Sequence, residues 1–253
     1  MLSRNKTIFI HKSLVVLLGS VIMIFSCNNT STLNTNQGIE NSNIVWYSLN
    51  PKSSNIKFFL KNDSGSYFNS IGKLKSWLIR QNDELIFAIN GGMFKKDFSP
   101  LGLYIENGKV ISKINNVREA YGNFYLQPNG VFSISKDKIA SIVKTQNFVS
   151  DSTINFATQS GPLLLYNDTI NPLLTKGSTN LHIRNGVGIK PNGELLFAMS
   201  KERINFYDFA SFFKENNCST ALYLDGFVSR TYLPEKNWKQ LDGQLGVLIG
   251  VVK

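Results

Sequence analysis

Short hydrophobic runs bounded by turn residues recur along the chain from residue 43 to its end. Val, Ile, Phe, Tyr and Leu dominate these runs, which is typical of β-strands, and Asn-Gly and Asp-Gly pairs separate several of them. The pattern predicts strands over residues 43–49, 55–60, 84–89, 101–106, 123–127, 130–135, 139–144, 154–159, 161–166, 186–191, 194–199, 221–224 and 245–253.

Two other segments, residues 67–81 and 205–217, carry apolar residues at helical three- and four-residue intervals. The apolar positions are Phe68, Ile71, Leu74, Trp77 and Leu78 in the first segment, and Phe206, Phe209, Ala210 and Phe213 in the second. Asn205 is the expected N-cap of the second helix, with Asp208 three residues further on. The whole pattern predicts a strand-rich α+β single domain, with a large mixed sheet and a few flanking helices.

The first residues have the form of a signal peptide: a basic start, an apolar run over residues 13–25, and then Ser26-Cys27. The run is shorter than the roughly 20 residues that span a bilayer. Residues 24–27, Ile-Phe-Ser-Cys, resemble the bacterial lipobox, which implies cleavage before Cys27 and lipidation of that cysteine. The alternative is an ordinary signal peptide with an incidental cysteine.

These features predict three parts of the chain. Residues 1–26 are the lipoprotein signal peptide, residues 27–43 are a polar Asn/Ser/Thr-rich tether, and residues 44–253 are one domain. The expected location is the bacterial cell envelope, outside the cytoplasm, with the lipid anchor binding the membrane.

The chain of 253 residues has 27 Lys and Arg against 17 Asp and Glu, a net charge of +10 that falls to +7 without residues 1–26. The basic residues are scattered and form no block, so nucleic acid is not an expected partner. A mildly cationic surface suits anionic glycans, lipids or phosphate esters, and also simple solubility.

Cysteine and histidine are rare, which limits the chemistry available. If Cys27 is lipidated, Cys218 has no disulfide partner, and we expect it to be a small buried hydrophobe rather than a nucleophile. His182 is the one histidine after residue 26, so no zinc-ligand spacing is present.

Four stretches contain more polar and glycine residues than strand packing requires. In the first, Asn90-Gly91-Gly92 follows a hydrophobic strand. Two glycines allow positive φ and expose N–H groups to an anionic oxygen, although Asn-Gly is also a common hairpin turn. In the second, Ser160-Gly161 precedes Pro162, and its hydroxyl suits a sugar or a phosphate; an ordinary turn is the alternative.

The third and fourth stretches contain charged residues near strand ends. Alternation along a strand would place His182 and Arg184 on one face, where they could clamp a phosphate, although a lone arginine is more often solvated or salt-bridged. Asp225 directly follows the strand over 221–224, and Gly226, Ser229 and Arg230 come after it. Asp225 is therefore either a catalytic carboxylate or part of an Asp-Gly turn.

Five short motifs occur in a defined order over residues 44–253. They are Asn90-Gly91-Gly92-Met93-Phe94, Pro100-Leu101-Gly102, Ser160-Gly161-Pro162, Arg184 with Val187-Gly188-Ile189, and Leu224-Asp225-Gly226. In this order they resemble the phosphodiester glycosidase family, and the ending Asp-Gly-x-x-Ser-Arg is similar to its small bacterial lipoprotein branch.

The resemblance implies a hydrolase that cleaves a sugar-1-phosphodiester, with a glycan or sugar phosphate as substrate. It implies catalytic roles for Asp225 and Arg184. The substrate-binding residues that it implies are Asn90, Gly91, Gly92, Ser160, Gly161, His182, Gly226, Ser229 and Arg230.

Two questions stay open at the level of sequence. No cofactor is certain: Asp225 and Asn90 offer oxygen ligands for Ca²⁺ or Mg²⁺, but no loop has the dense acidic spacing of a dedicated site. The alternative functions are a non-catalytic glycan-binding lipoprotein and a lipoprotein of exopolysaccharide or envelope assembly.

Overall fold

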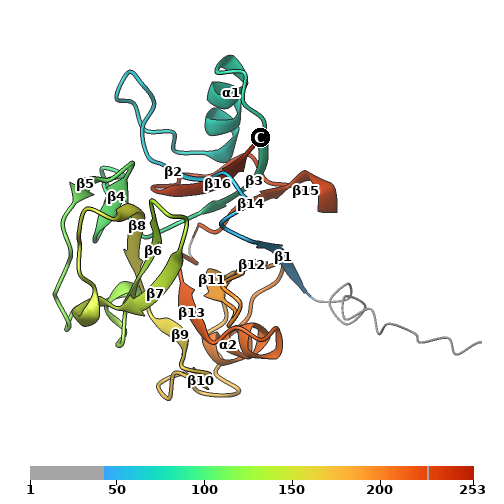
Figure 1. Cartoon of the computed structure of the whole chain (residues 1–253). Helices are drawn as coiled ribbons and strands as arrows, with labels where there is room; N and C mark the ends of the chain where they lie inside the picture. Colours follow the sequence, from blue (N-terminus) through green and yellow to red (C-terminus); the bar gives the residue numbers. More distant parts are fainter. Residues whose placement is uncertain (1–42, 227) are drawn as a thin grey trace, which may run out of the picture. The chain divides into compact units, whose positions relative to one another are not determined.

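The structure is a computed structural model that describes residues 43–226 and 228–253, which belong to one compact unit (Figure 1). The predicted signal peptide, the lipidation site Cys27 and the tether up to residue 42 lie outside the described residues and stay predictions. Within the described part of the chain, no helix is long and apolar enough to cross a membrane.

The strands form three sheets. The first sheet has the order β1 (Ile44–Leu49), β12 (Leu195–Ser200), β11 (Asn185–Ile189), β13 (Thr220–Tyr223), β9 (Leu163–Tyr166) and β10 (Thr169–Ile170). The second sheet has the order β15 (Trp238–Lys239), β14 (Thr231–Leu233), β3 (Leu85–Asn90), β16 (Leu248–Val252) and β2 (Ile56–Phe59). The third sheet has the order β5 (Lys109–Ser112), β4 (Tyr104–Glu106), β8 (Ile154–Ser160), β6 (Gly130–Ser135) and β7 (Ala140–Lys144).

The predicted α+β, strand-rich class is confirmed, but one detail of the sheet prediction is wrong. The strands are divided among three sheets instead of one large mixed sheet, and the strand pairs within the described residues are antiparallel. Many strands are joined by short turns, which permit antiparallel neighbours, whereas parallel neighbours need a long crossover.

Both predicted helices are confirmed, and each covers one sheet. Helix α1 (Ile71–Arg80) begins after Ser70, whose Oγ accepts a hydrogen bond from the Lys73 N–H at 3.2 Å. Helix α2 (Phe206–Glu215) begins after Asn205, whose Oδ1 accepts from the Asp208 N–H at 2.8 Å, as predicted. The apolar face of α1 packs with residues of the second sheet, and that of α2 with residues of the first.

Three short 3₁₀ helices complete the secondary structure: η1 (Asn123–Tyr125), η2 (Thr145–Asn147) and η3 (Pro234–Lys236). The strand predicted over residues 123–127 is therefore wrong. Phe124 is buried, as the hydrophobic pattern suggests, but a short apolar run does not distinguish a strand from another buried segment.

The central core lies where the three sheets face one another. Phe197 of the first sheet contacts Phe87 of the second, with ring centroids 5.2 Å apart, and Phe132 of the third, at 6.1 Å. All three side chains are almost completely buried. Aromatic packing across the sheets therefore joins them into one hydrophobic core.

Cys218 is buried, as expected for a small hydrophobe. Its Sγ lies 2.6 Å from the position that a Cβ would take at Gly188, so it fills the space that this glycine leaves. Burial raises the pKa of the Cys218 thiol to about 12, which keeps it protonated and unreactive at neutral pH.

We expect Phe197→Ala to lower the free energy of unfolding by about 3 to 5 kcal/mol, because it opens a cavity where three sheets meet. The measurement is equilibrium denaturation of the purified protein. Val149→Ala, at a side chain that is 72% exposed, is the control and should change stability by less than about 0.5 kcal/mol. Equal effects of the two substitutions would show that the aromatic contacts do not hold the sheets together.

Candidate active site

The ends of several strands meet in the interior and bring the predicted residues together. Asn185 opens β11, which is antiparallel to β13, so the Leu224 N–H donates to the Asn185 carbonyl oxygen at 3.1 Å. This register places Asp225, the next residue, beside Asn185. Asp225 is only 6% exposed.

A second register brings in the end of β3. Strand β14 is antiparallel to β3, so Arg230 lies beside Asn90. The Asn90 N–H donates to the Arg230 carbonyl oxygen at 3.3 Å, and the Arg230 N–H donates to Asn90 Oδ1 at 2.9 Å. Asn90 therefore holds the chain where it leaves the Asp225 segment and enters β14.

The side chain of Asn185 connects these two strand ends. Its Nδ2 donates to the backbone oxygen and to Oδ1 of Asn90, both at 2.8 Å, and its Oδ1 accepts from the Asp225 N–H at 2.7 Å. Asn90 and Asn185 are both buried. We call this set of three residues, Asn90, Asn185 and Asp225, the amide bridge, and it joins the first sheet to the second.

Two serines hold the backbone around Asp225. Ser160, the last residue of β8 in the third sheet, donates from Oγ to the Leu224 carbonyl oxygen at 2.5 Å. Ser229 donates from Oγ to the Asp225 carbonyl oxygen at 2.6 Å. Both hydroxyl groups therefore donate to the backbone on either side of the Asp225 N–H and position this segment, and their oxygens keep the capacity to accept hydrogen bonds.

Arg184 is completely buried at the start of β11. Its Nε donates to the Ile204 carbonyl oxygen at 2.8 Å, its Nη2 donates to the Asn180 carbonyl oxygen at 2.9 Å, and its Cζ lies 3.5 Å from the ring centroid of Phe206. No carboxylate of the described residues forms an ion pair with it, and its Nη1 makes no hydrogen bond there. Burial lowers the pKa of the guanidinium, but a group with an ordinary value of 12.5 stays charged at neutral pH.

Tyr223 lies between Arg184 and the Asp225 segment. The Arg184 Cζ is 5.6 Å from its ring centroid, and its hydroxyl oxygen lies 1.7 Å from the position that a Cβ would take at Gly226. Burial raises the pKa of Tyr223, the negative charge of Asp225 raises it further, and Arg184 opposes the shift. Tyr223 therefore stays protonated, and only glycine fits at position 226.

At the three other glycines of the predicted site, Gly91, Gly92 and Gly161, a side chain would also collide with neighbouring atoms. Neither Gly91 nor Gly92 has a positive φ, so the prediction that these glycines serve a positive φ is wrong. A Cβ would lie 2.6 Å from Ile249 Cγ1 at Gly91 and 2.6 Å from Thr158 Oγ1 at Gly92. The Gly91 N–H donates to Val247 at 2.8 Å, and Gly161 leaves no room for a Cβ against Asn129.

Two other predicted residues are placed differently from expectation. His182 is exposed and Arg184 is buried, so they do not share one face; regular β11 begins only at Asn185, after both residues. The Arg230 guanidinium forms a two-bond ion pair with Asp242, at 2.9 and 2.8 Å, and its Nη1 donates to the Ser229 carbonyl oxygen at 3.0 Å, so these two partners set its orientation.

The residues do not form an evident cation site. Asn90 Oδ1 already accepts from the Asn185 side chain and from the Arg230 N–H, which occupies both of its lone pairs. In the described ranges, no group of three or more His, Cys, Asp or Glu side chains is placed to hold a metal ion. Asp225 alone offers a carboxylate within the amide bridge.

Sequence reasoning did not select two residues of the site, Asn185 and Tyr223. Tyr223 stands two positions before Asp225, so strand alternation would have placed the two on one face. Asn185 follows Arg184 directly, but its three side-chain hydrogen bonds depend on strands that are far apart in the sequence. The fold and these residues define a strand-rich α+β protein that buries a carboxylate and an arginine where its strand ends converge.

Comparison with known proteins identifies the family. The phosphodiester glycosidase family model matches residues 83–250. The uncharacterized protein YigE of Escherichia coli (strain K12) is 37% identical over 188 residues, which are 74% of this chain and 73% of YigE. The chain belongs to the phosphodiester glycosidase family, which confirms the resemblance seen in its motifs.

A solved structure shows the same fold. It is the catalytic domain of zebrafish N-acetylglucosamine-1-phosphodiester alpha-N-acetylglucosaminidase, auto-inhibited by its pro-peptide. The TM-score is 0.55 at 15% sequence identity, and the match covers 84% of this chain and 84% of the zebrafish chain.

We expect Asn185→Ala to lower the free energy of unfolding by about 2 to 4 kcal/mol, because it leaves buried groups of Asn90 and Asp225 without hydrogen-bond partners. Denaturation of the purified protein measures this loss. Asn43→Ala removes one exposed hydrogen bond to Glu202 and should have almost no effect. A loss below about 0.5 kcal/mol for Asn185→Ala, the size of an ordinary surface change, would contradict the role of the amide bridge.

Proposed function

We propose that the protein hydrolyses sugar-1-phosphodiesters, at the bond between the anomeric carbon and the phosphate oxygen. The observation that carries this proposal is the buried Arg184 without a carboxylate partner. An uncompensated buried cation is unfavourable by several kcal/mol, and a bound anion relieves that energy. A guanidinium with a free Nη1 matches the oxygens of a phosphate.

Asp225 supplies the second group that this reaction needs. In the proposed step, water attacks the anomeric carbon, the bond from that carbon to the phosphate oxygen breaks, and the electron pair leaves with the phosphate. Asp225 accepts the proton of the attacking water and stabilises the positive charge that develops on the sugar. The products are the free sugar and a phosphomonoester.

Two further donors support binding of the phosphate. Tyr223 keeps its proton because its pKa is raised, so its hydroxyl can donate a hydrogen bond to an anionic oxygen. Asn90 Nδ2 is buried and has no partner within the described ranges. Such unpaired buried donors are rare in folded proteins and are expected where a ligand completes the hydrogen bonding.

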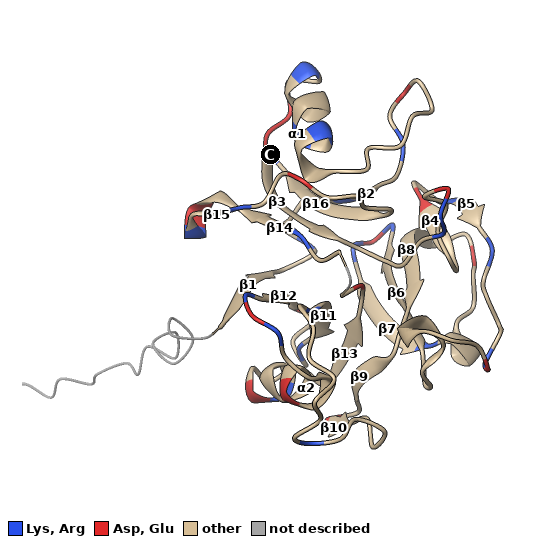
Figure 2. Cartoon of the chain, turned by 180° about the vertical axis from the view of Figure 1, so that it is seen from behind, with Lys and Arg blue, Asp and Glu red and all other residues tan. Residues whose placement is uncertain are grey.

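The cell envelope is the proposed location, and it rests on the sequence of residues 1–27. A lipid anchor at Cys27 would hold the domain beside envelope glycans. Figure 2 shows Lys and Arg scattered over helices, strands and loops, with Asp and Glu among them. This distribution supports a glycan or sugar-phosphate substrate, rather than nucleic acid.

A glycan-binding protein without catalysis is the alternative, and one observation favours it. The amide bridge is closely hydrogen-bonded and its residues are almost completely buried. Such a cluster could serve only to hold the strand ends that shape a binding surface. Turnover separates the two functions, because the binding protein would retain a sugar phosphodiester without cleaving it.

We expect Asp225→Asn to lower kcat by at least about a hundredfold, because the amide cannot accept the proton of the attacking water. Arg184→Ala should lower kcat/KM by at least about a hundredfold, because the charge on the leaving phosphate loses its partner. The assay measures N-acetylglucosamine released from the methyl phosphodiester of α-N-acetylglucosamine 1-phosphate by the purified protein.

Matched controls use the same substitutions at exposed sites: Asp168→Asn in a turn, and Arg80→Ala at the end of α1. Both should keep full activity. Full hydrolysis by the folded Asp225→Asn and Arg184→Ala variants would refute the proposed roles. The mechanism uses no cation, so activity should persist in EDTA, and a loss reversed by Mg²⁺ or Ca²⁺ would require a metal in the site.

A further inference from the structure

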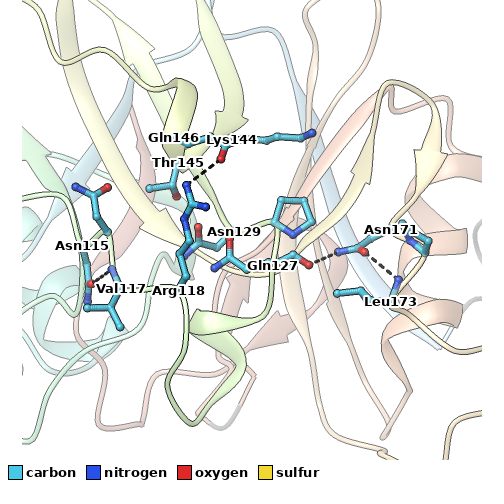
Figure 3. A pocket seen from close by; sticks show the side chains of 13 residues that line it. Asn115, Val117, Arg118, Gln127, Asn129, Lys144, Thr145, Gln146, Asn171 and Leu173 are labelled. Carbon is cyan, nitrogen blue, oxygen red and sulfur yellow. Dashed lines mark hydrogen bonds between the residues drawn. The ribbon is translucent and has the colours of Figure 1, made fainter.

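A separate cavity of about 640 Å³ lies beside the third sheet, within the usual volume range of small-molecule sites (Figure 3). Four segments surround it: residues 115–118, residues 127–129 before β6, residues 144–146 at the end of β7, and residues 171–173 after β10. We call it the amide pocket. None of the motif residues Asn90, Ser160, Arg184 and Asp225 lines it.

The chemistry of its lining is that of a carbohydrate site with a preference for acidic groups. Six amide side chains and one hydroxyl line it, together with two cations, and no Asp or Glu is among the described residues that do so. The polar lining residues are Asn115, Asn116, Gln127, Asn129, Gln146, Asn171, Thr145, Arg118 and Lys144. Amides both donate and accept, as sugar hydroxyls do, and the two cations match carboxylate or phosphate groups.

Two of these side chains form the rigid wall of the pocket. Asn171 donates from Nδ2 to Leu163 at 2.9 Å and accepts at Oδ1 from the Leu173 N–H at 3.1 Å. Asn115 accepts from the Val117 N–H at 3.0 Å and donates to Leu101 at 3.2 Å. These bonds hold the segments in place before a ligand arrives, which lowers the entropy lost on binding.

Other side chains keep their bonding capacity for a ligand. Among the described residues, the Arg118 guanidinium makes one long hydrogen bond, from Nη2 to Gln146 Oε1 at 3.3 Å, which Figure 3 draws as a dashed line. Within the described part of the chain, Lys144 Nζ and the Asn116 side chain make no hydrogen bond or ion pair; Lys144 Nζ lies 4.7 Å from the ring centroid of Tyr166. Both cations can therefore bind an acidic ligand without losing an ion partner.

A second, smaller cavity of about 160 Å³ leads from the amide pocket toward Arg184. It shares Gln127, Asn171 and Leu173 with the amide pocket. Asn180 and Phe206 also line it, and both contact the Arg184 guanidinium. A ligand longer than one sugar can therefore extend from the amide pocket into this smaller cavity, to the two residues that contact Arg184.

We propose that the amide pocket binds an acidic oligosaccharide chain, so that the substrate is an anionic glycan rather than a small sugar phosphate. The direction of that chain, toward Arg184, rests on the proposed function. Binding in the pocket itself does not, because neither Asp225 nor Arg184 lines it.

The test is isothermal titration calorimetry of the purified protein with a hyaluronan hexasaccharide, which carries carboxylates, and with neutral chitohexaose of the same length. We expect the acidic hexasaccharide to bind at least about tenfold more tightly, the effect of one charge-assisted hydrogen bond. The double variant Arg118→Gln/Lys144→Gln should lose this preference. Lys144→Arg keeps the charge and should bind within about threefold of the unsubstituted protein.

Lys201→Gln removes one positive charge at an exposed position outside the pocket, as Lys144→Gln does inside it, and should leave binding unchanged. An unchanged melting temperature of the double variant shows that it is folded. The proposal is overturned if neither hexasaccharide binds. It is also overturned if the double variant prefers the acidic hexasaccharide as strongly as the unsubstituted protein does.

The two proposals fail separately. Asp225→Asn should lower cleavage of the methyl phosphodiester at least about a hundredfold but leave the hexasaccharide affinity within about twofold, since Asp225 lines neither of the two cavities. Binding of the hexasaccharide without hydrolysis would refute the hydrolase and keep the glycan pocket. Hydrolysis without binding of the acidic hexasaccharide would refute the glycan pocket and keep the hydrolase.

Discussion

The side chain of Asn185 is the interaction on which the rest of the site depends. It donates twice to Asn90 and accepts from the Asp225 N–H, so three hydrogen bonds join strand ends from two different sheets. Ser160 adds a bond from the third sheet to Leu224. The chain at Leu224 and Asp225 is thus bonded to residues of all three sheets. Buried hydrogen bonds of this kind gain strength from their low-dielectric surroundings, but become costly if one partner is removed.

The buried arginine imposes the second constraint. Arg184 is enclosed by carbonyl oxygens and by the ring of Phe206, which stabilise a cation only in part. The fold therefore contains a positive charge that no described carboxylate neutralises, next to a tyrosine that stays protonated. Folding energy is used to hold this charge in place, and binding an anion recovers it. The amide pocket also carries positive charge, because two cations and none of the described carboxylates line it.

Much of this could be predicted from residues alone, and the failures have physical causes. The helices were found because α1 and α2 bury a periodic apolar face and have a polar cap, which are local properties. The motif glycines were found, but the reason proposed for Gly91 and Gly92 was wrong, because φ is local whereas the contacts with Ile249 and Thr158 come from distant strands. His182 was grouped with Arg184 by an alternation that holds only inside a regular strand, and β11 begins after both.

The sequence by itself determined the class of fold, the two helices, most of the strands and the family, because each follows from local pattern or from the order of short motifs. Only the tertiary structure decided which polar groups are used by the protein and which are left for a ligand. Ser160, Ser229 and Arg230 have the right chemistry to bind a substrate, yet their side chains are bonded to the protein. Arg184 keeps a free donor, although its residue type is the same as that of Arg230. The difference arises because strands far apart in the sequence pair with one another and decide which groups lie beside each side chain. No short stretch of sequence contains that information.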